Sequence, residues 1–218
     1  MKAPSHPPTE GAIRFSFELT PAHAADALPP AQFHCLAAWR DILRHLRLLG
    51  RDVRRYDGYH YGNLSVRDPA CARRFFITAS QSSGRRRLPA RQIVRIDTWD
   101  IQRFALTATG AAAPSSESVS HAMVYAVDPD IGWVMHVHSA VIWQRAEALG
   151  LPCISADVVY GSPAMAHGIA HLLTQRRERP LVFTTLGHGD GVFAAGADAH
   201  ATGGALVRTL AHALEQDA

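Results

Sequence analysis

The chain has 218 residues, of which 47% are hydrophobic and 19% are charged, and its formal net charge is +3. This composition is typical of a folded globular protein and excludes a disordered or fibrous chain. The length suits a single domain, and the small net charge gives no reason to expect bulk binding of nucleic acid or of a membrane surface.

The basic and sulfur-containing residues exclude several kinds of chemistry. Lys2 is the only lysine among the 22 basic residues, whereas Schiff-base and pyridoxal-phosphate enzymes need a buried lysine and a Walker loop needs one beside its phosphates. Cys35, Cys71 and Cys153 are far apart in the sequence, which predicts neither a disulfide framework nor a thiolate zinc site. With no apolar run near the roughly 20 residues of a spanning helix, we expect a soluble cytoplasmic protein.

The first half of the chain combines one helix pattern with several short strand patterns. Residues 1–30 are rich in proline and show no hydrophobic period, so we expect an N-terminal arm ahead of a single domain over residues 31–218. Apolar residues between positions 31 and 49 recur with the spacing of one helix face, and Gly50 ends the pattern. Four strands are predicted next, at Asn63–Arg67 and at residues 74–78, 93–97 and 102–106.

Helix and strand patterns alternate more regularly in the second half. Helices are predicted at residues 114–128, 140–149, 163–174 and 199–215. Buried strands are predicted at residues 131–138, at Leu181–Thr185 and at residues 191–194. Helices that interleave with strands in this way indicate a layered α/β fold.

Two histidines on one predicted strand are the first candidates for chemistry. His136 and His138 are separated by one residue within an apolar run. Because side chains alternate across a strand, both imidazoles leave the same face, with Cα atoms roughly 6.5 Å apart, a span that one metal ion can bridge. Taken alone, the pair is also compatible with two polar residues on the solvent face of a strand.

A third histidine and a carboxylate extend this pattern. His188 lies in a glycine-rich turn directly after the strand Leu181–Thr185. Its flanking glycines allow a sharp turn that exposes the ring, and a third neutral imidazole would leave the open position that catalytic zinc requires; a plain turn is the alternative. Glu117 lies in the first turn of the helix that leads to the two histidines, where its other role is to stabilise the helix dipole.

Five short motifs occur in the order and approximate spacing of the class II aldolase/adducin family. They are GNLSVR at residues 62–67, ITAS at 77–80, PSSE at 114–117, HVHS at 136–139 and GHG at 187–189. The chain resembles this family over about residues 31–215. The resemblance implies a three-layer α/β/α sandwich with a mainly antiparallel central sheet, and a homotetramer with a metal site near a subunit interface.

The resemblance also assigns roles to residues of the site. It implies that His136, His138 and His188 bind Zn²⁺ or another divalent metal such as Mn²⁺, Co²⁺ or Fe²⁺, and that Glu117 acts as acid and base. Relatives use a tyrosine as proton donor, sometimes from a neighbouring subunit. Tyr160 lies in the corresponding region, and a buried structural tyrosine is the alternative.

For the substrate, the resemblance implies a phosphate-binding pocket. Asn63, Ser115 and Ser116 match the family positions directly. The loop after the ITAS strand does not, because Ser80 is followed by a longer polar segment, so the usual Ser-Gly pair is either displaced to Ser83-Gly84 or lost.

An arginine-rich segment follows this loop. Seven arginines and no acidic residue lie between Arg73 and Arg95. Residues 85–95 form either an electropositive mouth that attracts a phosphate or carboxylate, through a residue such as Arg85, or a solvated or interface surface. Since no aromatic residues are interleaved with these arginines, nucleic-acid binding is not expected.

The function implied by the resemblance is that of a metal-dependent lyase acting on a small-molecule substrate. It would cleave a small sugar phosphate or related hydroxy-carbonyl compound by aldol chemistry through a metal-stabilised enediolate, which requires no lysine. A sugar-phosphate dehydratase or decarboxylase would use the same site and remains an alternative. Two further alternatives are a non-catalytic adducin-like binding module and an iron oxygenase, whose metal is held by two histidines and one carboxylate.

Overall fold

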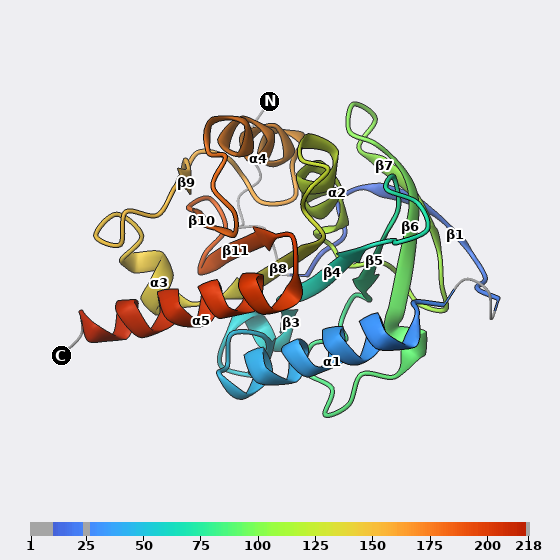
Figure 1. Ribbon diagram of the computed structural model, residues 1–218, viewed down its shortest axis with the longest axis horizontal. Helices are drawn as coiled ribbons and strands as arrows, with labels where there is room; N and C mark the ends of the chain where they lie inside the picture. Colours follow the sequence, from blue (N-terminus) through green and yellow to red (C-terminus); the bar gives the residue numbers. More distant parts are fainter. Residues whose placement is uncertain (1–10, 24–26, 217–218) are drawn as a thin grey trace.

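The computed structural model describes residues 11–23 and 27–216, which contain a nine-stranded mixed sheet (Figure 1). Neighbouring strands are antiparallel except at the two edges, where β1 pairs with β7 and β9 pairs with β10 in parallel. The order across the sheet is β1 (Ser16–Thr20), β7 (Ala105–Thr109), β6 (Ile93–Asp100), β5 (Phe75–Thr78), β4 (Asn63–Arg67), β8 (Trp133–His138), β11 (Gly191–Gly196), β10 (Leu181–Thr185) and β9 (Cys153–Ile154).

Five α-helices of the described residues cover the two faces of this sheet (Figure 1). One face packs against α2 (Ser118–Val127) and α4 (Pro163–Gln175). The other packs against α1 (Pro30–His45), α3 (Ala140–Gln144) and α5 (Ala199–Glu215). The three-layer α/β/α sandwich with a mainly antiparallel sheet is therefore confirmed.

The side chains of β8 show how the sheet separates the two apolar cores. Val134 belongs to the core beneath α2 and α4, whereas Met135 and Val137 belong to the core beneath α1, α3 and α5. All three side chains are fully buried, and each such burial contributes about 1.5–3 kcal/mol. Alternation along this central strand therefore fixes which layer each of its residues faces.

Most predicted elements are present, but several bounds differ: the helix predicted to reach residue 49 ends at His45, and the helix predicted from residue 114 begins at Ser118. Both Asn63–Arg67 and Leu181–Thr185 form strands as predicted, and the last helix begins after Asp198, whose carboxylate accepts a hydrogen bond from the Ala201 N–H at 2.8 Å. The strand predicted at residues 102–106 is shifted to β7, because the preceding strand continues to Asp100 and the turn extends to Phe104. The helix predicted at 140–149 ends at Gln144 and continues as turns.

The N-terminal segment corrects the prediction of an arm. Residues 16–20 form β1, with Phe17 opposite Leu106 of β7, and Phe15 packs into the core. Phe15, Phe17 and Leu19 alternate with polar residues, a strand pattern that the surrounding prolines obscure. Residues 1–10 and 24–26 of the predicted arm lie outside the described residues.

The connection between α1 and β4 is built from short elements. It contains the two-stranded antiparallel sheet of β2 (Gly50–Arg51) and β3 (His60–Tyr61), with a 3₁₀ turn at Tyr56–Gly58 between them. A second 3₁₀ turn, Ala90–Gln92, precedes β6. Across residues 11–23 and 27–216, no helix combines the length and the hydropathy needed to cross a membrane.

Candidate metal centre

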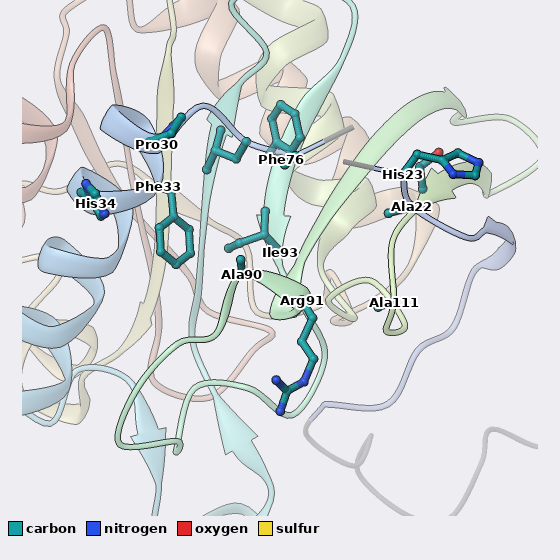
Figure 2. A pocket seen from close by; sticks show the side chains of 13 residues that line it. Ala22, His23, Pro30, Phe33, His34, Phe76, Ala90, Arg91, Ile93 and Ala111 are labelled. Atoms are coloured by element: carbon teal, nitrogen blue, oxygen red, sulfur yellow. The ribbon is translucent and has the colours of Figure 1, made fainter. Parts of the chain in front are cut away.

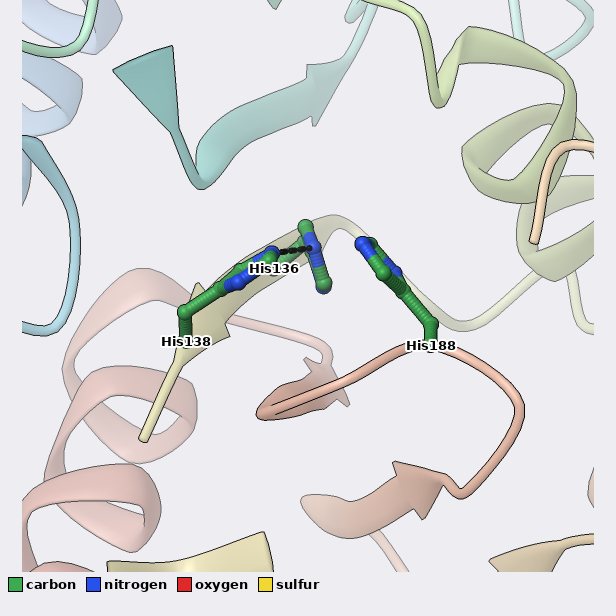
Figure 3. Close-up of side chains that lie close together, drawn as sticks. All are labelled: His136, His138 and His188. Atoms are coloured by element: carbon green, nitrogen blue, oxygen red, sulfur yellow. Dashed lines mark hydrogen bonds between the residues drawn. The ribbon is translucent and has the colours of Figure 1, made fainter. Parts of the chain in front are cut away.

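The three predicted metal ligands lie together in the structure (Figure 3). One ring nitrogen from each of His136, His138 and His188 lies within 4.8 Å of the other two, and all three residues are buried. The Nε2 atoms of His136 and His138 are 3.1 Å apart. Two nitrogens bound to one tetrahedral zinc ion at about 2.0–2.1 Å lie about 3.4 Å apart, so this pair already has the spacing of a metal site.

Sheet geometry places the first two histidines. His136 and His138 point to the face of β8 that Val134 also occupies, beneath α2 and α4, as the predicted alternation requires. β8 is hydrogen-bonded on both sides, to β4 and to β11. The two imidazoles are therefore held by a strand in the middle of the sheet.

The turn between β10 and β11 places His188, but not as an exposed residue. A Cβ atom at Gly187 would lie 2.0 Å from the carbonyl oxygen of Val158, so only glycine permits this approach. The ring of Tyr160 stacks on His188 with centroids 4.2 Å apart, and both residues are buried. The expectation of an exposed ring is wrong: at Gly187 the turn lies against Ala156 and Val158, and the His188 ring is covered by Tyr160.

Glu117 lies between the histidines. It directly precedes α2, so it occupies the N-cap position and not the first turn. Its Oε2 atom lies 2.8 Å from His136 Nε2 and its Oε1 atom lies 3.3 Å from His188 Nδ1. The Asn63 side chain donates a hydrogen bond of 2.9 Å to Oε2. The structure thus joins the predicted carboxylate and the predicted asparagine to the histidine triad.

The charges of these groups suit a cation. Burial raises the pKa of Glu117, but His136 and the hydrogen bonds from His136 and His188 outweigh it and hold that pKa well below its ordinary value. Burial, together with repulsion from His188 and His136, lowers the pKa of His138 well below its ordinary value. Glu117 is therefore a carboxylate and His138 a neutral imidazole, the form that coordinates a metal.

A second layer of polar residues beside the triad was not predicted. The Tyr56 ring packs edge-on against His138 with centroids 4.8 Å apart, and its hydroxyl donates to the Asp190 carboxylate at 2.5 Å. The Arg55 guanidinium lies 3.2 Å from the same carboxylate. Asp190 follows the GHG motif closely enough to be suspected, whereas Arg55 and Tyr56 lie in a loop without any sequence signal.

A buried histidine also lies behind the site. His121 on α2 contacts Ser65 Oγ through Nδ1 at 2.7 Å, and the same Oγ lies 2.8 Å from the Tyr125 hydroxyl. Burial lowers the pKa of His121 to about 3, which keeps the ring neutral. The sequence showed His121 only as a position on an apolar helix.

The predicted substrate residues surround a small polar cavity next to Asn63. The cavity is lined by Asn63, Ser80, Ser83, Ser115 and Ser116. Gly84 does not line it, although its N–H donates to Nδ1 of the lining residue His60 at 3.0 Å. The Ser83 hydroxyl donates to the Gly62 carbonyl, so the expected Ser83-Gly84 pair is not presented to this cavity as a unit.

One buried arginine holds the serine-rich loop. Arg40 on α1 is 1% exposed, and its guanidinium donates to the carbonyl oxygens of Ser83, at 2.8 Å, and of Arg85. It also pairs with Asp41 at 2.6 Å. The loop is thus fixed by a side chain from a distant helix, which its own sequence does not indicate.

A larger cavity lies elsewhere in the molecule, between the start of α1 and the sheet (Figure 2). It measures about 480 Å³, and its floor includes Leu28, Phe33, Phe76 and Ile93. Arg91 of the arginine-rich segment lines it, but none of the predicted metal ligands, catalytic residues or phosphate-binding residues does. Its size alone therefore does not make it the site of chemistry.

Comparison with known proteins gives a family and a set of similar folds. The family described as Class II Aldolase and Adducin N-terminal domain matches residues 40–207. The L-fuculose-1-phosphate aldolase of Thermus thermophilus has a TM-score of 0.60 and 20% identity, over 85% of this chain and 96% of that chain. A sugar-phosphate aldolase from Thermotoga maritima has a TM-score of 0.59 and 14% identity, over 85% and 95% of the two chains.

An aldolase II superfamily protein from Pseudomonas syringae has a TM-score of 0.53 and 18% identity, over 89% of this chain and 77% of that chain. At these identities the solved structures show a shared fold alone. No curated protein matches the sequence. Because the family match spans most of the domain and includes the histidine triad and Glu117, the chain belongs to the Class II Aldolase and Adducin N-terminal domain family.

Proposed function

We propose that this protein is a metal-dependent lyase that cleaves a carbon–carbon bond of a small sugar phosphate, or of a related hydroxy-carbonyl compound, by aldol chemistry. The observation that carries the proposal is a cluster of three buried imidazoles, two of which, His136 and His188, lie within 3.3 Å of the Glu117 carboxylate. A small cavity lined by hydroxyl groups lies beside it, sharing Asn63 with the centre.

The histidine triad is the proposed metal ligand set. His136, His138 and His188 would hold Zn²⁺ or another divalent ion such as Mn²⁺, Co²⁺ or Fe²⁺. The fit rests on the spacing of their ring nitrogens and on the neutral state of His138. When bound, such an ion polarises a carbonyl oxygen as a Lewis acid and so favours an electron pair on the neighbouring carbon.

Glu117 is the proposed acid and base. A general base must lie within about 3 Å of the proton that it removes, directly or through one water. Glu117 is ionised, and Asn63 fixes the orientation of its carboxylate beside the triad. In cleavage it takes the proton of the substrate hydroxyl whose carbon–carbon bond breaks, the oxygen becomes a carbonyl, and the electron pair passes to the other fragment.

Tyr160 is the proposed donor of the proton that this second fragment needs. Its ring lies directly on His188, so the phenol belongs to the same site. This role is supported by the family resemblance together with the stacking. A Tyr160→Phe variant tests it: unchanged turnover would indicate that the ring only packs against His188.

The small polar cavity is the proposed place for the substrate phosphate. It measures about 10 Å³, room for about one water, so its lining side chains would have to move apart to admit the phosphate. Ser80, Ser115 and Ser116 line it, and α2 begins two residues after Ser116. Backbone N–H groups at a helix N-terminus and neighbouring hydroxyls favour a negatively charged group. Arg85 is exposed and does not line the cavity, which favours a phosphate here over a carboxylate paired with that arginine.

A substrate panel tests the proposal. Phosphorylated ketoses and non-phosphorylated hydroxy acids are incubated with metal-loaded and chelator-treated protein, and the products are identified by mass spectrometry. Metal-dependent cleavage into two carbonyl-bearing fragments supports it. Loss of water identifies a dehydratase and loss of carbon dioxide a decarboxylase, whereas no turnover by the metal-loaded protein would favour the binding module.

The assembly follows the same resemblance. We propose a homotetramer, and light scattering of the purified protein would give a mass near four times 23.7 kDa.

A further inference from the structure

A second charged cavity lies outside the candidate metal centre. It measures about 270 Å³ and lies between the end of α1, β2 and the loop that follows β2. It shares no lining residue with the small polar cavity of the proposed substrate phosphate. The charged side chains that line it are those of Arg44, Arg47, Arg51, Asp52 and Arg54.

These side chains leave a large excess of positive charge. Four arginines line the cavity, of which Arg54 has Asp52 3.6 Å from its Nε and Arg44 has Asp41 4.0 Å from its Nε. Within residues 11–23 and 27–216, neither Arg47 nor Arg51 forms an ion pair with an acidic side chain. Like charges gathered in one cavity repel each other, so a multivalent anion would stabilise the arrangement.

The end of α1 presents one of these arginines at an unusual position. The Leu48 N–H donates to the Leu43 carbonyl at 2.9 Å and the Arg47 N–H donates to the Arg44 carbonyl at 3.0 Å. This is the Schellman arrangement, in which the residue at the Arg47 position adopts a positive φ and is usually glycine. Arg47 has a φ of 57°, so the chain keeps a charged side chain where glycine is favoured.

The helix end does not account for all four arginines. Basic residues near a helix C-terminus stabilise its dipole, which explains Arg44 and its neighbour His45. Arg51 and Arg54 come from the following strand and loop. Arg51 is held in place by a hydrogen bond of 2.8 Å from its Nε to the Gly58 carbonyl. The dipole of α1 therefore does not explain the position of this guanidinium.

We propose that this cavity binds a phosphoryl or diphosphoryl group of a small molecule. Guanidinium groups recognise such oxyanions by paired hydrogen bonds. Among the described residues, the two cavity arginines without an acidic partner are Arg47 and Arg51. Their two positive charges match a phosphoryl dianion or one end of a diphosphate, whereas a carboxylate would balance only one of them. The proposal is independent of the lyase function, since it involves no residue of the metal centre.

Binding of inorganic diphosphate to the full chain tests this proposal. Calorimetric titration is made on metal-loaded and on chelator-treated protein. We expect binding in both forms and at least a tenfold loss of affinity in an Arg47→Gln/Arg51→Gln variant. The matched control is Arg177→Gln/Arg208→Gln, which removes the same charge from two exposed positions and should leave the affinity unchanged.

Several results would overturn the proposal. These are no binding, binding by the metal-loaded form alone, equal weakening in the control, or weakening by Ser115→Ala/Ser116→Ala and not by the arginine pair. Should the arginine pair fail to fold, Arg51→Gln and Arg54→Gln singly carry the same test. Because diphosphate binding requires no turnover, the result stands whether or not the lyase function is confirmed.

Kinetics separate the two sources of the phosphoryl group. If it belongs to the substrate, Arg47→Gln/Arg51→Gln raises KM for phosphorylated substrates and diphosphate competes with them. If it belongs to a separate effector, the variant loses diphosphate binding while its KM stays the same.

Discussion

The metal centre and the serine-rich loop after β5 are positioned in different ways. Two of the three histidines lie on β8, in the middle of the sheet, so backbone hydrogen bonds on both sides fix their direction. The loop has no such ladder and is held by the buried guanidinium of Arg40. The comparison teaches that sheet periodicity positions the proposed metal ligands, whereas the loop beside the proposed anion pocket depends on side-chain hydrogen bonds between segments distant in sequence, that of Arg40 among them.

Removal of a strand histidine tests the first half of this comparison and should have the largest effect. We expect His136→Ala to lower the metal content from about one ion per chain to near zero, because two imidazoles alone bind a divalent ion weakly. Elemental analysis of the purified variant measures this. His212→Ala, which changes an exposed histidine on α5, is the control; equal metal content in wild type and His136→Ala would refute the ligand assignment.

Neutralisation of the carboxylate should separate metal binding from proton transfer. Glu117→Gln keeps the volume and the contact with Asn63, so we expect normal metal content with kcat lowered by about 10² or more. Steady-state kinetics and elemental analysis on the same preparation check both parts. Unchanged turnover would remove Glu117 from the proposed mechanism.

Loss of the arginine that holds the loop tests the second half. Arg40→Met leaves buried carbonyl oxygens of the loop without donors, which should lower the free energy of unfolding by about 2–4 kcal/mol. It should also raise KM for a phosphorylated substrate without changing the metal content. Urea unfolding and kinetics measure these effects, with Arg208→Met, at an exposed position of α5, as control. A lower metal content in Arg40→Met would show that the two regions are not held separately.

The buried histidine behind the site predicts a pH-dependent stability. The pKa of His121 is about 3 in the folded chain and about 6.5 in an unfolded one. Below pH 6.5 only the unfolded chain takes up this proton, so the stability present at neutral pH is lost as the pH falls toward 3. Between pH 7 and pH 5 the loss is about 2 kcal/mol.

Urea unfolding at these two pH values measures the effect. In His121→Asn the free energy of unfolding should change by about 2 kcal/mol less between pH 7 and pH 5 than in the wild type. His171→Asn, at an exposed position of α4, should show the same change as the wild type. Equal dependence in all three proteins would contradict the buried neutral state of His121.

The predictability of the molecule follows the same division. The alternation of β8 gave the direction of His136 and His138, and the glycines around His188 gave a turn, so the triad was accessible from the sequence. β1 was missed because prolines surround a short alternating run. Tyr56 and Arg40 could not be predicted, because their contacts join segments that no local pattern relates.

The buried ring of His188 shows what the local sequence pattern could not predict. Glycine spacing indicated a tight turn, but the neighbour that requires the glycine, the Val158 carbonyl, comes from a separate segment. Whether such a turn faces solvent or protein depends on that neighbour. Sequence patterns therefore identified the residues of the candidate site better than they predicted which residues would pack around them.

Two histidines of the triad lie on a central strand and the third lies in a turn, and this has a consequence for the exchange of a bound metal ion with solvent. Amide protons of β8 are protected by two neighbouring strands and should exchange with solvent only at a free energy close to that of global unfolding. Residues 186–190 lie outside the strand ladder, so we expect this turn to open at a lower free energy than β8. Entry and release of an ion at the proposed centre would then follow the local opening of residues 186–191. Metal exchange and hydrogen exchange of this turn would share one rate, while His136 and His138 stay in place on β8.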